Sequence, residues 1–191
     1  IKNLPFIAPH FTNRLMLQQR YQPAQSYNTT LNLPLQHLIT QQATQYITRN
    51  RHLGIHNTAA LLINFDTMQV EAELGSVDFF NRKIHGQVNG TRAKRSPGST
   101  LKPFIYASAI DQGLIHPYSL LKDAPKRFGA YTPENYDQKF MGPVLATQAL
   151  TLSRNVPAVS LQAQLTNPTF YQTLHNAGIS QLRPPAFYGL A

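Results

Sequence analysis

The order of the predicted elements is the feature that most constrains the fold of this chain. Residues 59–65 form a short apolar run, and after a polar turn Val70, Ala72 and Leu74 alternate with polar side chains. This pattern is typical of a β-hairpin, which ends at Gly75. Longer stretches with apolar residues at helical spacing lie before and after the hairpin. One short hairpin among several helices predicts an α+β fold with an antiparallel sheet.

Proline and glycine set the boundaries of the predicted helices, because a proline suits the first turn of a helix and a glycine readily ends one. The predicted boundaries are Pro34 to about Gly54, Gly98 to Gly113, Pro143 through Leu150 with a break at Asn155-Val156-Pro157, and the N-cap and N1 pair Asn167-Pro168 to Gly178. Residues 1–26 show no clear period and are interpreted as a linker or approach segment, followed by a domain over residues 27–191. Residues 116–142 are irregular, as are many long loops that cover a site.

The charge balance is strongly basic. Among 191 residues, 17 Lys and Arg face 8 Asp and Glu, which gives a net charge of +9, so polyanions are the first partners to consider. No nucleic-acid recognition motif is present, and the basic residues are not interleaved with aromatic ones as a base-stacking surface requires. We therefore expect no nucleic-acid partner, and we interpret the basic loop of residues 80–98 as a solvated face.

Composition excludes several kinds of site. The chain has no cysteine, which excludes a disulfide framework, a thiolate zinc site and a cysteine nucleophile. His52 and His56 have the spacing of two zinc ligands on a helix, but Gly54 lies between them and no glutamate accompanies them. We therefore expect no metal site. No apolar run approaches the length that spans a bilayer.

The sharpest candidate for chemistry is the segment Ser99-Thr100-Leu101-Lys102. At the start of a helix, this spacing places the Ser99 hydroxyl and the Lys102 ammonium on one face, a turn apart. A serine hydroxyl becomes a good nucleophile when a base removes its proton, and a lysine can be that base once burial disfavours its charged form. Gly98 leaves room for a substrate beside the backbone, and the helix start offers N–H groups to a developing oxyanion.

The same spacing alone means little, because Ser119-Leu120-Leu121-Lys122 repeats it within the irregular stretch. Context separates the two segments: only the first follows Pro97-Gly98 and precedes a long apolar helix. We interpret the second as incidental.

A second element with chemical potential is Ser153-Arg154-Asn155, where a predicted helix ends at a turn. The Ser153 hydroxyl could relay a proton between Lys102 and a leaving group, and the Asn155 amide could hold the carbonyl of a bound acyl group. Ser26-Tyr27-Asn28 has the same short pattern. A polar helix end that caps its own backbone is therefore the alternative reading of this triplet.

Four segments together resemble the transpeptidase domain of class A penicillin-binding proteins, most closely the 1C type. They are RSPGSTLKPF (residues 95–104), GLIHPYSLL (113–121), YTPENYDQKFMGPV (131–144) and LSRNVPA (152–158). TTLNLPLQ (29–36) and the hairpin also look like the opening of that domain. The resemblance covers roughly residues 27–180 and implies a β-lactamase/penicillin-binding transpeptidase-like fold. In it, a helical subdomain stands beside an antiparallel sheet that is incomplete at the C-terminus, so 27–191 is the N-terminal portion of the domain.

The resemblance also implies an activity. It is that of a serine D,D-transpeptidase, which cross-links peptidoglycan stem peptides ending in D-Ala-D-Ala through an acyl-enzyme and is acylated by β-lactam antibiotics. Ser99 would be the nucleophile, Lys102 its general base, Ser153 the proton relay and Asn155 the contact to the substrate amide. No cofactor or metal is implied. The site would face the periplasm at the inner membrane, with the membrane anchor outside this chain.

Three alternatives remain beside that activity. The family's Lys-Thr-Gly motif has no match in this sequence, which leaves open a non-catalytic remnant that binds cell-wall peptide or a partner. A D,D-carboxypeptidase uses the same acyl-enzyme and differs only in its acceptor. A serine β-lactamase usually deacylates with a glutamate-activated water, and the absence of any acidic residue after Asp137 disfavours it.

Overall fold

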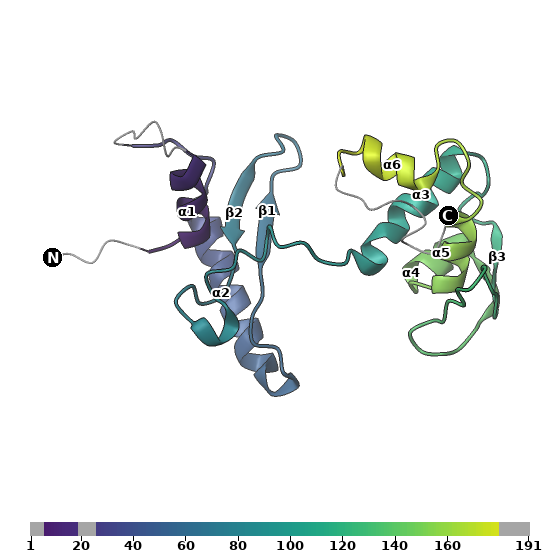
Figure 1. Ribbon diagram of the computed structural model, residues 1–191, viewed down its shortest axis with the longest axis horizontal. Coiled ribbons are helices and arrows are strands. Elements are labelled where there is room, and N and C mark those ends of the chain that lie inside the picture. The colour runs from purple at the N-terminus through teal and green to yellow at the C-terminus, as the bar shows by residue number, and fades with distance from the viewer. Residues whose placement is uncertain (1–5, 19–25, 180–191) are drawn as a thin grey trace. The chain divides into compact units, whose positions relative to one another are not determined.

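The computed structural model describes residues 6–18 and 26–179. The chain divides into two compact units, with the boundary between Arg95 and Ser96, and each unit is described separately (Figure 1). The parts of the predicted segments 1–26 and 27–191 that fall on residues 1–5, 19–25 and 180–191 lie outside the described residues.

The first unit is a β-hairpin covered by two helices. Its elements are α1 (Pro9–Gln18), α2 (Leu33–Asn50), the 3₁₀ turn η1 (Arg51–Leu53), β1 (Ala60–Ile63), β2 (Val70–Leu74) and the 3₁₀ turn η2 (Arg82–Ile84). β1 pairs antiparallel with β2, with Ala60 opposite Leu74, and both α1 and α2 pack against β2 (Figure 1). The predicted hairpin is confirmed.

Helix α2 begins where the proline predicted it. Asn32 is the N-cap, and its side-chain oxygen accepts a hydrogen bond from the Leu35 N–H at 3.2 Å, which satisfies one of the free N–H groups of the first turn. Pro34 lies in that turn, where its missing N–H costs nothing. The helix and the following turn η1 end at Gly54 in a left-handed conformation, as predicted.

Helix α1 was not predicted, because the sequence of residues 1–26 shows no clear helical period and is interpreted as a linker or approach segment. Its burial is confined to one end, at His10 and Phe11, so the sequence shows little helical periodicity. Long-range contacts hold it instead: Arg14 forms an ion pair with the buried Glu73 carboxylate at 3.0 Å. A helix stabilised in this way leaves a weak signal in sequence.

Over its described residues, 96–179, the second unit packs four helices and a second pair of antiparallel strands around one core. Its elements are the 3₁₀ turn η3 (Gly98–Leu101), α3 (Lys102–Asp111), β3 (Leu120–Asp123), β4 (Gly142–Leu145), α4 (Ala146–Thr151), α5 (Asn155–Gln162) and α6 (Phe170–Asn176). β3 pairs antiparallel with β4, with Leu120 opposite Leu145. The core gathers side chains from α3, β4, α4, α5, α6 and the turn after α5: Ile105, Tyr106, Ala109, Val144, Ala146, Ala149, Ala158, Leu161, Leu165 and Phe170.

The predicted helix at Pro143 is wrong. Pro143 lies in β4, opposite Lys122, and the helix begins at Ala146. A proline is tolerated here because a two-stranded sheet has edges where no N–H is needed. The stretch 116–142 was predicted to be a loop. It contains β3, which pairs with β4, the strand that includes Pro143.

Two further helix boundaries were misplaced. Helix α5 begins at Asn155 and takes Pro157 into its first turn, so Asn155-Val156-Pro157 opens a helix rather than breaking one. The peptide between Asn167 and Pro168 is cis, and the N-cap of α6 is Thr169. Thr169 forms a capping box with Gln172.

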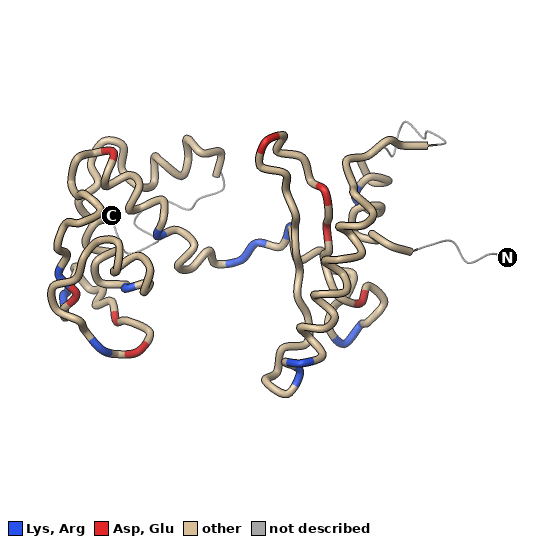
Figure 2. The backbone as a smooth tube through the Cα atoms, turned by 180° about the vertical axis from the view of Figure 1, so that it is seen from behind, with Lys and Arg blue, Asp and Glu red and all other residues tan. Residues whose placement is uncertain are grey.

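The basic side chains of the loop 80–98 are exposed, as predicted, although Gly86 within it is buried. All five of its cations lie at the surface, and they are Arg82, Lys83, Arg92, Lys94 and Arg95. The blue stretch that leads away from the first unit in Figure 2 is the end of this loop. Among the described residues, no helix has both the length and the apolar character needed to cross a bilayer.

Candidate active site

Ser99 and Lys102 lie on one side of a tight turn. The 3₁₀ turn η3 runs directly into α3, and the Lys102 backbone N–H donates to the Ser99 carbonyl. Because a 3₁₀ turn has three residues per turn, side chains three apart lie one above the other. Ser99 is exposed, whereas only 7% of Lys102 is exposed. The fold therefore carries an exposed serine and a buried lysine on the same short turn.

The backbone before Ser99 depends on glycine. Gly98 has φ +52°, in the left-handed region, and a Cβ placed there would meet no atom within 4 Å. Glycine is thus favoured by the backbone conformation and not by crowding. The open space beside it leaves the backbone next to Ser99 accessible to a ligand.

Three of the four predicted site residues meet at the Lys102 head group. Lys102 Nζ donates to the Ser153 carbonyl at 2.5 Å, to Ser153 Oγ at 3.0 Å and to Asn155 Oδ1 at 2.5 Å. These acceptors match the three N–H donors of an ammonium. The Ser99 hydroxyl makes no hydrogen bond to any residue of 6–18 or 26–179, so the structure brings together Lys102, Ser153 and Asn155 but leaves the hydroxyl unengaged.

The surroundings of Lys102 disfavour its positive charge. Burial is the larger cause and the nearby Arg154 guanidinium the second, and together they lower the pKa of Lys102 from its ordinary value of 10.5. The three oxygen acceptors act in the opposite sense, but they do not outweigh burial. Lys102 therefore loses its proton more readily than a lysine in water.

Ser153 occupies a backbone position that usually belongs to glycine. After α4 the chain closes with a Schellman motif: the Ser153 N–H donates to the Leu150 carbonyl and the Arg154 N–H to the Ala149 carbonyl, both at 2.9 Å. The residue in the middle of such a motif is left-handed, and Ser153 has φ +54°. A non-glycine residue held there is strained, and such strain is concentrated at functional sites.

Asn155 is oriented by contacts to the loop before β4. Its backbone N–H donates to Asn135 Oδ1 at 2.7 Å, and its side-chain Nδ2 donates to the Glu134 carbonyl at 2.6 Å. With the amide nitrogen turned toward Glu134, the amide oxygen faces Lys102. We call residues 153–155 the Ser-Arg-Asn turn.

A buried cluster lies next to this turn that the sequence did not predict. Arg154 Nε donates to Asp123 Oδ2 at 2.8 Å, and Asn135 Nδ2 donates to Asp123 Oδ1 at 2.8 Å. A second ion pair joins Arg154 to Asp137 at 3.0 Å. The only signal in sequence was an arginine between two candidate site residues. Because the stretch 116–142 was read as a loop, its Asp123 and Asn135 were not paired with it.

The positions of Ser119 and Lys122 in the structure agree with the interpretation that their spacing is incidental. Lys122 lies in β3, and residues three apart along an extended strand point to opposite faces. Ser119 Oγ instead accepts a hydrogen bond from the His116 N–H at 2.9 Å. The same spacing therefore places both residues on one short turn at Ser99 and Lys102, whereas here the lysine lies in a strand.

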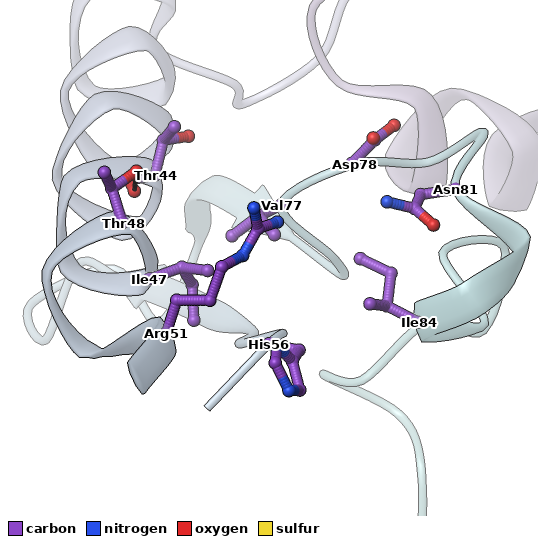
Figure 3. A pocket seen from close by; sticks show the side chains of 9 residues that line it. All are labelled: Thr44, Ile47, Thr48, Arg51, His56, Val77, Asp78, Asn81 and Ile84. Carbon is purple, nitrogen blue, oxygen red and sulfur yellow. Dashed lines mark hydrogen bonds between the residues drawn. The ribbon is translucent and has the colours of Figure 1, made fainter. Parts of the chain in front are cut away.

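A pocket of about 320 Å³ lies in the first unit, outside the unit that carries the predicted site. Figure 3 shows Arg51, the first residue of η1 after α2, reaching toward the loop that carries Asp78 and Asn81, with His56 below. None of the predicted site residues lines it. Within the described ranges, no group of three or more His, Cys, Asp or Glu side chains could hold a metal ion.

The sequence matches one known family over most of its length. The family described as penicillin binding protein transpeptidase domain matches residues 58–187. The chain is 36% identical over 183 residues to Penicillin-binding protein 1C of Escherichia coli (strain K12), which covers 96% of this chain and 23% of that protein. It is 37% identical over 135 residues to Penicillin-binding protein 1F of Bacillus subtilis (strain 168), covering 68% of this chain and 18% of that protein.

Solved structures share the fold. The PonA1 protein of Mycobacterium tuberculosis in complex with penicillin V matches with a TM-score of 0.67 and 18% identity, over 94% of this chain and 49% of that one. Penicillin-Binding Protein 1A of Haemophilus influenzae matches with a TM-score of 0.56 and 26% identity, over 64% of this chain and 18% of that one. These similarities confirm the predicted fold class. The chain spans less than a quarter of the length of the curated relatives given above.

Proposed function

The chain belongs to the transpeptidase domain family of the penicillin-binding proteins and is of the class A, 1C type, and from this we propose that it carries the acylation site of a serine D,D-transpeptidase. The proposed donors are peptidoglycan stem peptides ending in D-Ala-D-Ala, and β-lactams would acylate the same serine. Residues 27–191 would form part of the transpeptidase domain. Since such substrates lie outside the cytoplasm, we place the site on the periplasmic face of the inner membrane.

In the first step, the Ser99 oxygen attacks the carbonyl carbon of the penultimate D-Ala. Lys102 in its neutral form takes the hydroxyl proton, which requires a lone pair on Nζ. When the tetrahedral intermediate collapses, the peptide C–N bond breaks and the departing amine of the last D-Ala needs a proton. The Ser153 hydroxyl, 3.0 Å from Lys102 Nζ, passes the proton from the lysine to that amine.

In the second step, an amine from a neighbouring stem peptide attacks the ester on Ser99. The same groups act in reverse: Ser153 and Lys102 accept the proton of the amine and return it to the Ser99 oxygen as the ester breaks. The Asn155 amide keeps one N–H beyond the one used by the Glu134 carbonyl, and that donor would hold the substrate amide. With water in place of the amine, the same steps would give the carboxypeptidase.

The observation that carries this proposal is the buried Lys102 head group. It lies against Ser153 and Asn155 and belongs to the same turn as the exposed Ser99. Within the described residues Lys102 meets neutral oxygens and no carboxylate, and burial, followed by the Arg154 guanidinium, lowers its pKa. This environment suits a base.

The test is the mass of the full-length protein after incubation with benzylpenicillin. We expect the mass to rise by one opened penicillin and the label to persist. Trypsin should release residues 96–122 as one peptide, because the bond between Lys102 and Pro103 resists cleavage, and this peptide holds both Ser99 and Ser119. Fragmentation of the peptide should place the label on Ser99. A label on Ser119, or no label on a folded protein, would contradict the proposal; rapid loss of the label would indicate a β-lactamase.

The rate of acylation should depend on pH through Lys102. Only the neutral amine accepts the serine proton, so the rate should rise with pH and level off above the pKa of Lys102. Since burial and Arg154 lower that pKa, the midpoint of the rise should lie clearly below 10.5. Stopped-flow labelling with a fluorescent penicillin between pH 5 and 10 measures it. A midpoint at the ordinary lysine value, or a rate that does not change with pH, would be the contrary result.

A further inference from the structure

The Ser-Arg-Asn turn is fastened from its inner side by buried polar groups. Its side chains alternate: Ser153 and Asn155 reach Lys102, whereas Arg154 points into the second unit with only 7% of the residue exposed. There the guanidinium donates to Asp123 Oδ2 at 2.8 Å. Asp123 ends β3, which packs against both α4 and α5, the helices on either side of the turn (Figure 1).

Asn135 closes the connection from Asp123 back to the turn. Its Nδ2 donates to Asp123 Oδ1 at 2.8 Å, and its Oδ1 accepts from the Asn155 backbone N–H at 2.7 Å. Asp123 is fully buried and Asn135 is 3% exposed. A continuous path of hydrogen bonds therefore runs from the Arg154 side chain through two buried side chains to the backbone of the next residue.

The chemistry of this path requires a carboxylate at position 123. Three donors converge on its two oxygens: Arg154 Nε, Asn135 Nδ2 and the Met141 N–H at 3.0 Å. An asparagine has the same shape, but its NH₂ group would face at least one of these donors. It would also remove the buried negative charge that pairs with the guanidinium at 2.8 Å, so that the exposed Asp137 carboxylate would be left as its ion-pair partner among the described residues, a costly change in the interior.

From these contacts we infer that Asp123, Asn135 and Arg154 are positioning residues, which hold the oxygens of the Ser-Arg-Asn turn against Lys102. The rate of serine acylation then depends on Asp123, although Asp123 makes no hydrogen bond to Ser99 or Lys102. The inference rests on the proposed function. A displacement of reacting groups by about 1 Å lowers rates by roughly 10²-fold. The Asn155 side chain is also held by the Glu134 carbonyl, whereas Ser153 at the other end of the turn is exposed.

The test compares Asp123→Asn with the unaltered full-length protein in stopped-flow labelling by a fluorescent penicillin. A positioning role lowers the rate constant of acylation at saturating penicillin, whereas a purely structural role lowers the amplitude, because fewer molecules are folded. We expect the rate constant to fall by roughly 10²-fold, with half-saturation within about threefold of the original. If Asp123→Asn does not fold, Asn135→Ala decides the question. It keeps the ion pair but removes the acceptor of the Asn155 N–H, and its rate constant should fall roughly tenfold.

The first unit supplies a matched control. Glu73 is also a buried carboxylate, 3% exposed, and it also accepts from an arginine and an asparagine, Arg14 at 3.0 Å and Asn89 at 2.7 Å. Glu73→Gln should lower the amplitude and leave the rate constant within about twofold of the original. Equal slowing in the Glu73 and Asp123 variants would overturn the inference, and so would an unchanged rate constant in Asp123→Asn.

These outcomes are separate from a failure of the proposed function. If the unaltered protein takes no label, or Ser99→Ala labels as fast as the original, the acylation site is wrong and the positioning role falls with it. If the unaltered protein labels on Ser99 and the Asp123 variant keeps its rate constant, only the positioning role is wrong.

Discussion

Replacement of Ser99 by alanine is expected to abolish acylation by benzylpenicillin. The alanine keeps the backbone of η3 and the buried contacts of Lys102 with Ser153 and Asn155, since the Ser99 hydroxyl makes none of them. It removes the atom that forms the ester. Deletion of a nucleophile typically lowers the rate on the order of 10⁶-fold, so no adduct should be seen by intact mass after hours. Because Ser99 is exposed, the melting temperature of the Ser99→Ala protein should stay within about 1–2 °C of that of the original.

Ser119→Ala is the matched control for this variant. It removes the serine of the second Ser-x-x-Lys segment, whose hydroxyl accepts from the His116 N–H, and it should label at the original rate. Labelling that survives in Ser99→Ala but disappears in Ser119→Ala would move the nucleophile to the other segment. Labelling that survives in both would exclude a serine ester at either position.

Replacement of Lys102 by alanine should slow acylation by about 10³–10⁴-fold, toward the upper end of what a general base contributes. The variant loses the acceptor for the Ser99 proton, and it also leaves Ser153 Oγ and Asn155 Oδ1 without the ammonium that they contact. Burst labelling with a fluorescent penicillin measures the loss. An unchanged rate in a folded Lys102→Ala protein would end the assignment of Lys102 as the base.

Lys102→Arg separates the base from the cation. An arginine keeps the positive charge and the donors, but it does not give up its proton in a protein. If Lys102 acts by accepting a proton, the arginine variant should be as slow as the alanine variant. Substantial activity in Lys102→Arg would mean that the charge alone suffices. The control is Lys122→Ala, at an exposed position of β3, which should acylate normally.

The hairpin, α2 and the turn that carries Ser99 were predictable because their signals are local. Alternating side chains, a proline in a first turn and a left-handed glycine act on their immediate neighbours. Helix α1 and strand β3 were not predicted. α1 depends on an ion pair between Arg14 and Glu73, far apart in sequence, and β3 depends on pairing with β4 across a long irregular segment.

The candidate site also has parts with a local sequence signal and a part without one. The spacing of Ser99 and Lys102 predicts a shared helix face, and in the structure the two residues lie on a 3₁₀ turn that runs into α3 rather than on an α-helix. The proton-relay and acyl-binding roles predicted for Ser153 and Asn155 also required them to lie near Lys102. The contacts of Asp123 and Asn135 that anchor the turn could not be predicted from the sequence. They depend on the burial of both residues side by side, and both lie in a stretch that was predicted to be a loop.

The left-handed backbone of Ser153 means that the residue best for thermal stability at this position differs from the residue that the proposed reaction needs. Glycine would relieve strain worth about 1 kcal/mol or more and would keep the Schellman hydrogen bonds, which use only backbone atoms. It would also delete the hydroxyl that contacts Lys102. A directed-evolution campaign that screens only for thermal tolerance should therefore enrich glycine at this position. We expect a relative that has glycine at this position and an otherwise intact turn to fold like this domain but to lack the proposed acyl-transfer activity.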